Sequence, residues 1–458
     1  PPDPSCCQRF RYAFLCPPHG TVAQGLTLVL CLLLAWGLLW GITGAQALPG
    51  GNLFSIFIVV VCASVGGRLV QIIHLPPLLG MLIVGFALRN IPVINVAKDI
   101  DPMWSGALRN TALAVILTRA GLGLDPVALR KLSRGVFLLA FSPCIAETVV
   151  EAIAAHFILG FPWLWGVMLG FVLAAVSPAV VVPSMLSLHE QGYGVIKGIP
   201  TLVIAAASVD DVLAISGFGV ALGIAFSKGD LVWTIFKGPL EAVLGIVYGF
   251  LLGFLGWYFP HSQHGSRNLF RFLFLFAAGL FSIFVSLRAE LSGAGALGAL
   301  TTAFVVAVKW RGEMEAHTTM PVSEAFAVLW VVFQPVLFSL IGAEVSIEAL
   351  QPKTVGLGLA VLGLGLSLRL VVSFLAVFGL NFNWKEKFFI PLAWLPKATV
   401  QAAIGSYALD TARAFGSDPE DIKLGTQVVL TIAVLSIVIT APLGAAAIAL
   451  SAPRLLHK

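Results

Sequence analysis

The segment Ile204-Ala-Ala-Ala-Ser-Val-Asp-Asp-Val-Leu-Ala-Ile215 places two adjacent aspartates in the middle of a long apolar stretch, residues 198–226. Such a stretch is long enough to cross a bilayer as one helix, which takes about 20 mostly apolar residues. Because a charged group at mid-bilayer is costly, Asp210 and Asp211 are candidate ion-binding residues. The alternative is a structural pair that a buried lysine or arginine neutralises.

The whole chain has the composition of a membrane protein. Hydrophobic residues make up 59% of its 458 residues and charged residues only 11%, against about 25% charged residues in soluble domains. The net charge of +5 comes without a basic run, which argues against a nucleic-acid partner, and the six cysteines lack metal-ligand spacing. No nucleophile–base pattern or cofactor motif indicates an enzyme, so we expect a membrane protein without a cofactor.

Apolar stretches divide the chain into fourteen expected spans with short connections. They are 21–44, 53–73, 76–93, 105–124, 135–158, 162–188, 198–226, 230–259, 268–288, 292–309, 322–345, 354–379, 386–409 and 424–450. We expect one all-α polytopic domain over 21–451, with an N-terminal stub at 1–20 and a C-terminal tail at 452–458. Because the chain does not begin with methionine, we expect a longer natural N-terminus.

Lysines and arginines in the loops predict the orientation, since they concentrate on the cytoplasmic side. One side carries Arg9, Arg11, Arg130, Lys131, Arg134, Lys197, Arg267, Arg271, Lys309, Arg311, Lys385, Lys387, Arg454 and Lys458. The other side carries only Lys98, Lys228, Lys353, Arg413 and Lys423. We therefore expect both termini in the cytoplasm.

Three short motifs recur in the same order, at offsets of 218, 221 and 218 residues. The matched segments are 79–86 with 297–304, 117–121 with 338–342, and 175–178 with 393–396. The third expected span pairs with the tenth, and this odd separation means that the two copies enter the membrane from opposite sides. Inverted repeats are typical of secondary transporters. We place the first repeat at about 76–226 and the second at about 292–450.

Prolines interrupt the two spans that carry the third motif: Pro178 and Pro183 in the first, Pro391 and Pro396 in the second. Proline removes a helical hydrogen bond and disfavours helix at the residue before it. We expect helix breaks at Pro178 and Pro396, with the carbonyls of residues 174–177 freed or loosened. In lipid such carbonyls must face protein or water. A tolerated kink is the alternative.

Other ionisable residues lie inside expected spans. Because buried charges are normally paired, Glu147 and Arg369, on repeat-related helices, form the most economical ion pair. Glu151, one helical turn from Glu147, is the rival partner, and Lys397 directly follows the Pro396 break. Arginines near span ends are expected to reach the lipid headgroups: Arg68, Arg89, Arg109, Arg119 and Arg288.

The aspartate pair suits cation exchange. Sodium is a hard cation that prefers oxygen ligands, and a carboxylate removed from water binds protons more strongly, so one group can hold either ion. Adjacent helix positions point about 100° apart, so one aspartate can face the ion path while neighbours hold the other. Further candidate ligands are the carbonyls of Ala175 and Val176, with Ser177.

These motifs, together with Leu75-Pro-Pro-Leu-Leu-Gly-Met-Leu, Ile116-Leu-Thr-Arg-Ala-Gly-Leu and Val176-Ser-Pro-Ala-Val, resemble the monovalent cation/proton antiporters. Within these the chain is most similar to the mammalian NHA-type Na⁺/H⁺ antiporters of solute carrier family 9 subfamily B, over essentially its whole length. The resemblance implies an NhaA-like antiporter fold with two broken crossing helices and a core domain that moves against a dimerisation domain. It also implies a homodimer that exchanges Na⁺ or Li⁺ for H⁺.

The resemblance assigns roles to single residues. Asp211 matches the acidic ion ligand of the family, and Asp210 its variable partner, which is Asp in electrogenic bacterial members and Asn in electroneutral exchangers. The bacterial electrogenic members have a membrane lysine on the helix that here carries Arg369, and arginine does not release its proton. The aspartate pair thus favours two protons per ion and Arg369 favours one. We expect electroneutral exchange.

The setting of the protein follows from the same resemblance. We expect a role in pH homeostasis at the plasma membrane, with endosomal and mitochondrial membranes as alternatives, and lipid at the dimer interface. The first span, 21–44, is additional to the usual thirteen and is expected at the dimer rim. Two other functions stay open, an Asp-lined cation channel and an organic-anion carrier on the same fold. The inverted repeat disfavours the channel, and the midplane aspartates disfavour the anion carrier.

Overall fold

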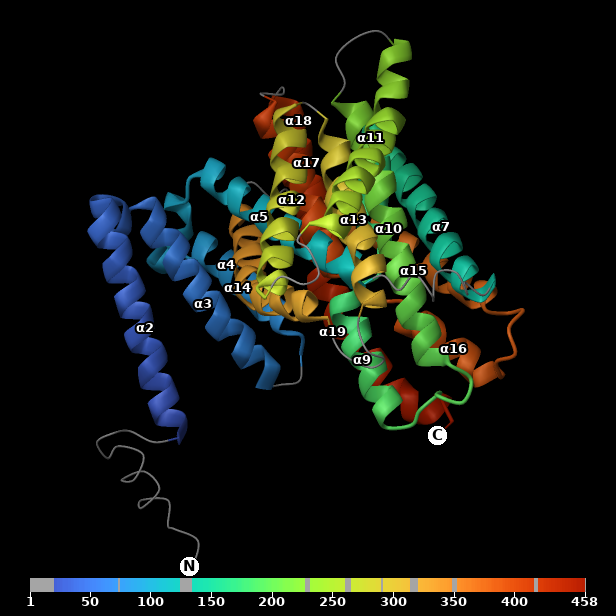
Figure 1. Ribbon diagram of the computed structural model, residues 1–458. Coiled ribbons are helices and arrows are strands. Elements are labelled where there is room, and N and C mark those ends of the chain that lie inside the picture. The colour runs from blue at the N-terminus through green and yellow to red at the C-terminus, as the bar shows by residue number, and fades with distance from the viewer. Residues whose placement is uncertain are drawn as a thin grey trace, which may run out of the picture.

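The computed structural model describes residues 20–72, 75–123, 134–226, 231–259, 265–289, 291–313, 320–347, 352–415 and 419–457. Within these ranges the protein is all-helical, without a strand (Figure 1). Nine helices there are long and apolar enough to cross a membrane. The remaining expected spans correspond to shorter or more polar helices and to two interrupted ones, so the count of fourteen stays a prediction.

The helices sort by their packing into two groups. We call the first the flanking bundle: α3 (Asn52–Ile72), α4 (Pro77–Asn90), α5 (Pro102–Gly123), α11 (Leu231–Tyr258), α12 (Arg267–Arg288), α13 (Ser292–Gly312) and α14 (Pro321–Glu344). We call the second the site bundle: α7 (Arg134–Leu159), α8 (Trp163–Ala174), α9 (Pro178–Glu190), α10 (Ile199–Ala225), α15 (Pro352–Ala376), α16 (Trp384–Ala393), α17 (Thr399–Ala414) and α19 (Thr431–Leu455). The bundles meet mainly where α10 packs on α11 and α13, and where α17 packs on α5 and α14.

The first expected span lies at the edge of the molecule. Helix α2 (Gly20–Thr43) stands beside α3 in Figure 1 and, among the described elements, packs mainly on α3 and on the short helix η1 (Gly44–Ala47). Its leucines are mostly exposed, with Leu34 at 64%. An apolar helix with so little protein contact needs a lipid or protein neighbour.

Matched glycines in the two copies of the second repeat motif lie at two equivalent helix crossings. In α14, a Cβ at Gly342 would overlap the Leu82 carbonyl of α4. In α5, a Cβ at Gly121 would overlap the Leu300 carbonyl of α13. The second motif of each copy therefore packs on the first motif of the other through a glycine, because only a small residue lets two membrane helices approach so closely.

The two spans that were expected to contain helix breaks are each divided into two helices. Residues 175–177 are unwound between α8 and α9, and residues 394–398 between α16 and α17. Pro178 begins α9, where its missing N–H costs nothing. Pro396 lies inside the second unwound segment.

Two of the expected interruptions are wrong. Pro183 lies within α9 and Pro391 within α16, and both helices continue through them. A proline removes only one helical hydrogen bond, so the rest of the helix can persist around it.

The last span also differs from its expected bounds. Helix α19 begins at Thr431 and runs to Leu455. A short helix α18 (Pro419–Leu424) and a π-helical turn η5 (Gly425–Leu430) precede it.

Candidate functional site

The two unwound segments are hydrogen-bonded to each other. The backbone N–H of Ser177 donates to the carbonyl of Pro396 at 2.7 Å. Ala175, Val176 and Ser177 are all fully buried. The helix breaks therefore meet at one place inside the site bundle.

Side chains from other segments cap the last carbonyls of α8. Arg369 of α15 donates to the carbonyl of Ala174 and, through Nε, to that of Trp394 at 3.0 Å. Lys397 donates to the carbonyl of Leu173. Since a helix C-terminus carries partial negative charge, the two cations complement it. They also satisfy carbonyls that the break leaves without backbone partners.

Gln401 of α17 is a further donor that sequence reasoning missed. Its Nε2 donates to the carbonyl of Ala175 at 2.6 Å and lies 3.5 Å from that of Leu173. One signal was available, because an amide just beyond the Pro396 break, in an apolar span, needs a hydrogen-bond partner.

Arg369 and Lys397, the two cations at the helix breaks, both contact the carboxylate of Glu147. Arg369 Nη1 lies 2.5 Å from Glu147 Oε2, and Arg369 Nη2 lies 3.2 Å from Asp210 Oδ2. Lys397 Nζ lies 2.8 Å from Glu147 Oε1. All four side chains are fully buried, so the structure brings the expected Glu147–Arg369 pair together and adds Lys397 and Asp210 to it.

The two neighbouring aspartates have different surroundings. Asp210 Oδ2 accepts a hydrogen bond of 2.7 Å from the backbone N–H of Val176, besides its contact with Arg369. Asp211, which is 6% exposed, takes part in none of the ion pairs between described residues. Asp210 is thus fixed to the unwound segment, while Asp211 is left available.

Several buried oxygens near the breaks accept no hydrogen bond from any described residue. They are Oδ1 of Asp210, Oδ1 of Asp211, Oγ of Ser177 and Oε1 of Gln401. Oxygen acceptors of this kind suit a hard monovalent cation. No group of three or more acidic, histidine or cysteine side chains that could hold a metal ion occurs in the described ranges.

Glu151 forms no ion pair with Arg369 among the described residues. It is fully buried, and neither carboxylate oxygen accepts a hydrogen bond in the part of the chain that the structure describes. Its carboxyl group occupies the space at Gly365 of α15, where a Cβ would overlap it. Glu147, and not its rival, is therefore the contact of Arg369.

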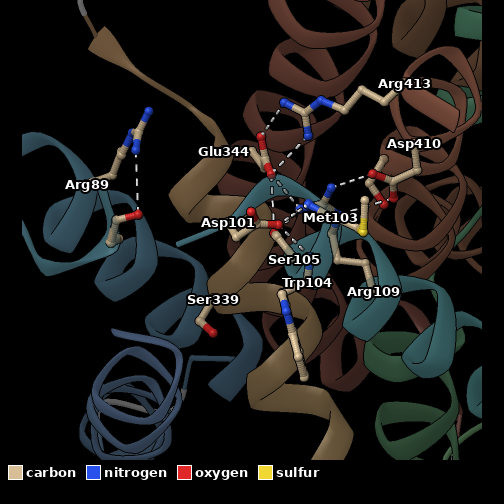
Figure 2. A network of polar contacts seen from close by, with 12 residues as sticks. Arg89, Asp101, Met103, Trp104, Ser105, Arg109, Ser339, Glu344, Asp410 and Arg413 are labelled. Carbon is tan, nitrogen blue, oxygen red and sulfur yellow. Dashed lines mark hydrogen bonds and ion pairs between the residues drawn. The ribbon is translucent and has the colours of Figure 1, made fainter. Parts of the chain in front are cut away.

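The expectation that Arg109 reaches the headgroups is wrong. Its side chain is 1% exposed and forms ion pairs with Glu344 at 2.8 Å and with Asp410 at 2.5 Å (Figure 2). Both carboxylates lie on other helices, and they satisfy the guanidinium inside the protein. Sequence reasoning missed Glu344 and Asp410 as partners.

A profile of the family described as "Sodium/hydrogen exchanger, transmembrane" matches residues 53–450. The chain belongs to this family. The exchanger is 49% identical to human sodium/hydrogen exchanger 9B2 over 465 residues, covering 100% of this chain and 85% of that protein. It is 44% identical to mouse sodium/hydrogen exchanger 9B1 over 449 residues, covering 97% of this chain and 78% of that protein.

The fold is similar to a solved antiporter. The sodium proton antiporter MjNhaP1 from Methanocaldococcus jannaschii at pH 8 aligns with a TM-score of 0.65 and 18% sequence identity. The alignment covers 89% of the exchanger and 99% of the antiporter chain. At this identity the likeness shows the fold alone.

These findings confirm the expected class. The exchanger is a multi-pass membrane transporter of the Na⁺/H⁺ type and not an enzyme, and its relatives confirm the resemblance to solute carrier family 9 subfamily B. Membership of this family favours ion exchange as the function and disfavours the two alternatives, the cation channel and the organic-anion carrier.

Proposed function

We propose that the exchanger swaps Na⁺ or Li⁺ for H⁺ at Asp211, one for one, by alternating access. The supporting observation is the contrast within the aspartate pair. Asp210 is held by Arg369 and by the backbone of Val176, whereas Asp211 forms no ion pair among the described residues. Asp211 can therefore take a proton or a metal cation in turn.

The unwound segment supplies the other proposed ligands. Ser177 brings a buried hydroxyl without a hydrogen-bond partner in the described ranges, and Ala175 and Val176 bring backbone carbonyls. The carbonyl of Ala175 already accepts from Gln401, but a carbonyl has two lone pairs, so a cation can still approach it.

Charge balance supports electroneutral exchange. Arg369 and Lys397 are two cations, and their contacts Glu147 and Asp210 are two carboxylates. This set of four is therefore neutral without Asp211. Neutrality matters here because burial of unbalanced charge is costly. Asp211 then carries either one proton or one Na⁺, and both loaded forms have the same net charge.

Exchange in proteoliposomes tests the assignment. Asp211→Asn should abolish Na⁺-driven and Li⁺-driven proton movement while the purified protein stays folded, because the amide holds neither a proton nor a cation by charge. Asp210→Asn should impair exchange less. Full activity of Asp211→Asn would rule out Asp211 as the ion site.

An imposed membrane potential tests the stoichiometry. One-for-one exchange moves no net charge, so the potential should neither speed nor slow it. A clear voltage dependence would show that a second group, such as Lys397 or Glu151, loses and gains a proton in each cycle.

The setting of the exchanger is part of the proposal. We propose a homodimer in the plasma membrane, with lipid at its interface and α2 at its rim, and with both termini in the cytoplasm. The exposed apolar length of α2 supports the rim position. The excess of Lys and Arg on one side supports the orientation.

A further inference from the structure

Four charged residues join the two bundles at one face of the membrane, the face where α5 begins and α14 ends. Arg109 of α5 lies between Glu344 of α14 and Asp410 of α17, and Arg413 of α17 contacts Glu344 from the other side (Figure 2). We call this face the Glu344 face and the four residues the Glu344 cluster. By the proposed orientation it is the extracellular face.

The cluster is neutral and becomes more buried towards the interior. The side chain of Arg413 is 28% exposed and that of Glu344 13%, whereas Asp410 is 4% and Arg109 1% exposed. Arg413 binds Glu344 with both terminal nitrogens, at 3.2 and 3.1 Å. Arg109 binds Asp410 through Nη2 and Nε, at 2.5 and 3.3 Å. Paired geometry of this kind makes strong, oriented contacts.

Two of the three ion pairs in the cluster, Arg109–Asp410 and Arg413–Glu344, join the flanking bundle to the site bundle. Arg109 and Glu344 belong to the flanking bundle, and Asp410 and Arg413 to the site bundle. The other ion pairs whose two partners are described stay within one bundle: Arg369–Glu147, Arg369–Asp210, Lys397–Glu147, Lys197–Glu386 and Arg271–Glu313. Among these ion pairs, the two that join the bundles therefore both lie at the Glu344 face.

Helix α17 connects the cluster to the ion site. It begins directly after the unwound segment of Lys397 and carries Asp410 on its twelfth position, about 17 Å further along the helix axis. Ser406 lies one turn inward from Asp410 and so shares its side of the helix. Ala402 and Leu409 on the same side belong to a hydrophobic cluster shared with α4 and α14.

Exchange requires that the buried site open to each face in turn. Opening at the Glu344 face must part α17 from α5 and α14, which would separate Arg109 from Asp410 and Arg413 from Glu344. We propose that the Glu344 cluster is a gate that closes the passage between Asp211 and the Glu344 face. Its two cross-bundle contacts bias the exchanger towards states that are closed there, and their loss speeds opening. This inference rests on the proposed alternating access at Asp211.

A buried cysteine below the gate reports its opening. In a chain whose six native cysteines are replaced by alanine, Ser406→Cys introduces a thiol at a position that is 1% exposed. A membrane-impermeant maleimide is added to intact cells or to everted vesicles, so that each face is probed separately. With the gate intact, labelling from the Glu344 face should be slow.

Neutral substitutions should open the gate. Arg413→Gln, and separately Arg109→Gln with Asp410→Asn, should raise the labelling rate from the Glu344 face by about tenfold, since about 1.4 kcal/mol between two states changes their ratio tenfold. Arg413→Lys keeps the charge and should restore slow labelling. Arg413→Gln removes only the outer, partly exposed pair, so it keeps the test decisive if the buried double variant does not fold.

Matched controls separate a gate from a general loss of structure. Arg271→Gln breaks an ion pair inside the flanking bundle and should leave labelling of Ser406→Cys unchanged. Equal labelling in all variants, or equal acceleration by Arg271→Gln, would overturn the gate. The site is tested separately: Asp211→Asn should still abolish exchange if the gate proposal fails, and retained exchange in Asp211→Asn is the failure of the proposed function.

Discussion

Removing either member of the Glu147–Arg369 pair should destabilise the exchanger, and the structure indicates by how much. Glu147 is the contact of both buried cations, so Glu147→Ala leaves Lys397 without its carboxylate and Arg369 with Asp210 alone. Breaking a buried ion pair by removing one partner costs about 3–5 kcal/mol. We expect a loss of that size for Glu147→Ala.

Arg369→Ala should cost more. Besides its carboxylates, Arg369 satisfies the carbonyls of Ala174 and Trp394. A buried carbonyl left without a donor costs about 1–3 kcal/mol, so the loss should exceed that of Glu147→Ala by about 2 kcal/mol or more. The double variant should not be neutral, because Lys397 and both carbonyls still lose partners.

A double-mutant cycle measures the contact itself. The unfolding free energy of the purified protein in mixed micelles, followed by tryptophan fluorescence, should show a coupling of about 2–3 kcal/mol between Glu147→Ala and Arg369→Ala. Glu151→Ala is the matched control, since this buried glutamate one turn away forms no ion pair with Arg369 among the described residues, and its coupling to Arg369→Ala should be much smaller. If the effects of Glu147→Ala and Arg369→Ala simply add, the two residues do not stabilise each other.

Three further predictions follow from other parts of the structure. A cysteine at Lys353 should react with an impermeant maleimide on intact cells and one at Arg134 should not; the reverse pattern would invert the proposed orientation. Gly85→Ala should lower the thermal stability, because its Cβ would overlap the Ser339 carbonyl where α4 crosses α14, and overpacking costs about 1–3 kcal/mol; unchanged stability would mean that this crossing relaxes freely. Gln401→Leu should destabilise the protein by about 1–3 kcal/mol by leaving the Ala175 carbonyl without its donor, and a stability equal to that of the unmodified protein would show that another group takes its place.

The sequence predicted those features that depend on strong local rules. Proline at positions 178 and 396 marked both helix breaks, and the cost of buried charge led to Glu147 and Arg369 as partners. The inverted repeat could be recognised because its glycines, such as Gly342, are each required by a close helix crossing.

Long-range contacts escaped prediction for a physical reason. An arginine near a span end looks the same whether it reaches the headgroups or pairs inside the protein, and the partners of Arg109 lie 235 and 301 residues away. Pro183 and Pro391 were misjudged because a proline ends a helix only where other groups take over the carbonyls of the preceding turn, as Arg369 does for Ala174.

The central claim is that one carboxylate, Asp211, holds either a proton or a sodium ion. Proton release on Na⁺ binding measures this directly: Na⁺ is added to the purified exchanger in weakly buffered solution at a pH where the site is protonated, and the released protons are counted with a pH indicator against bound Na⁺. We predict one proton per bound Na⁺ in the unmodified protein, the same ratio in Glu151→Gln, and no release from Asp211→Asn. Na⁺ binding without proton release, or release that persists in Asp211→Asn, would contradict the account.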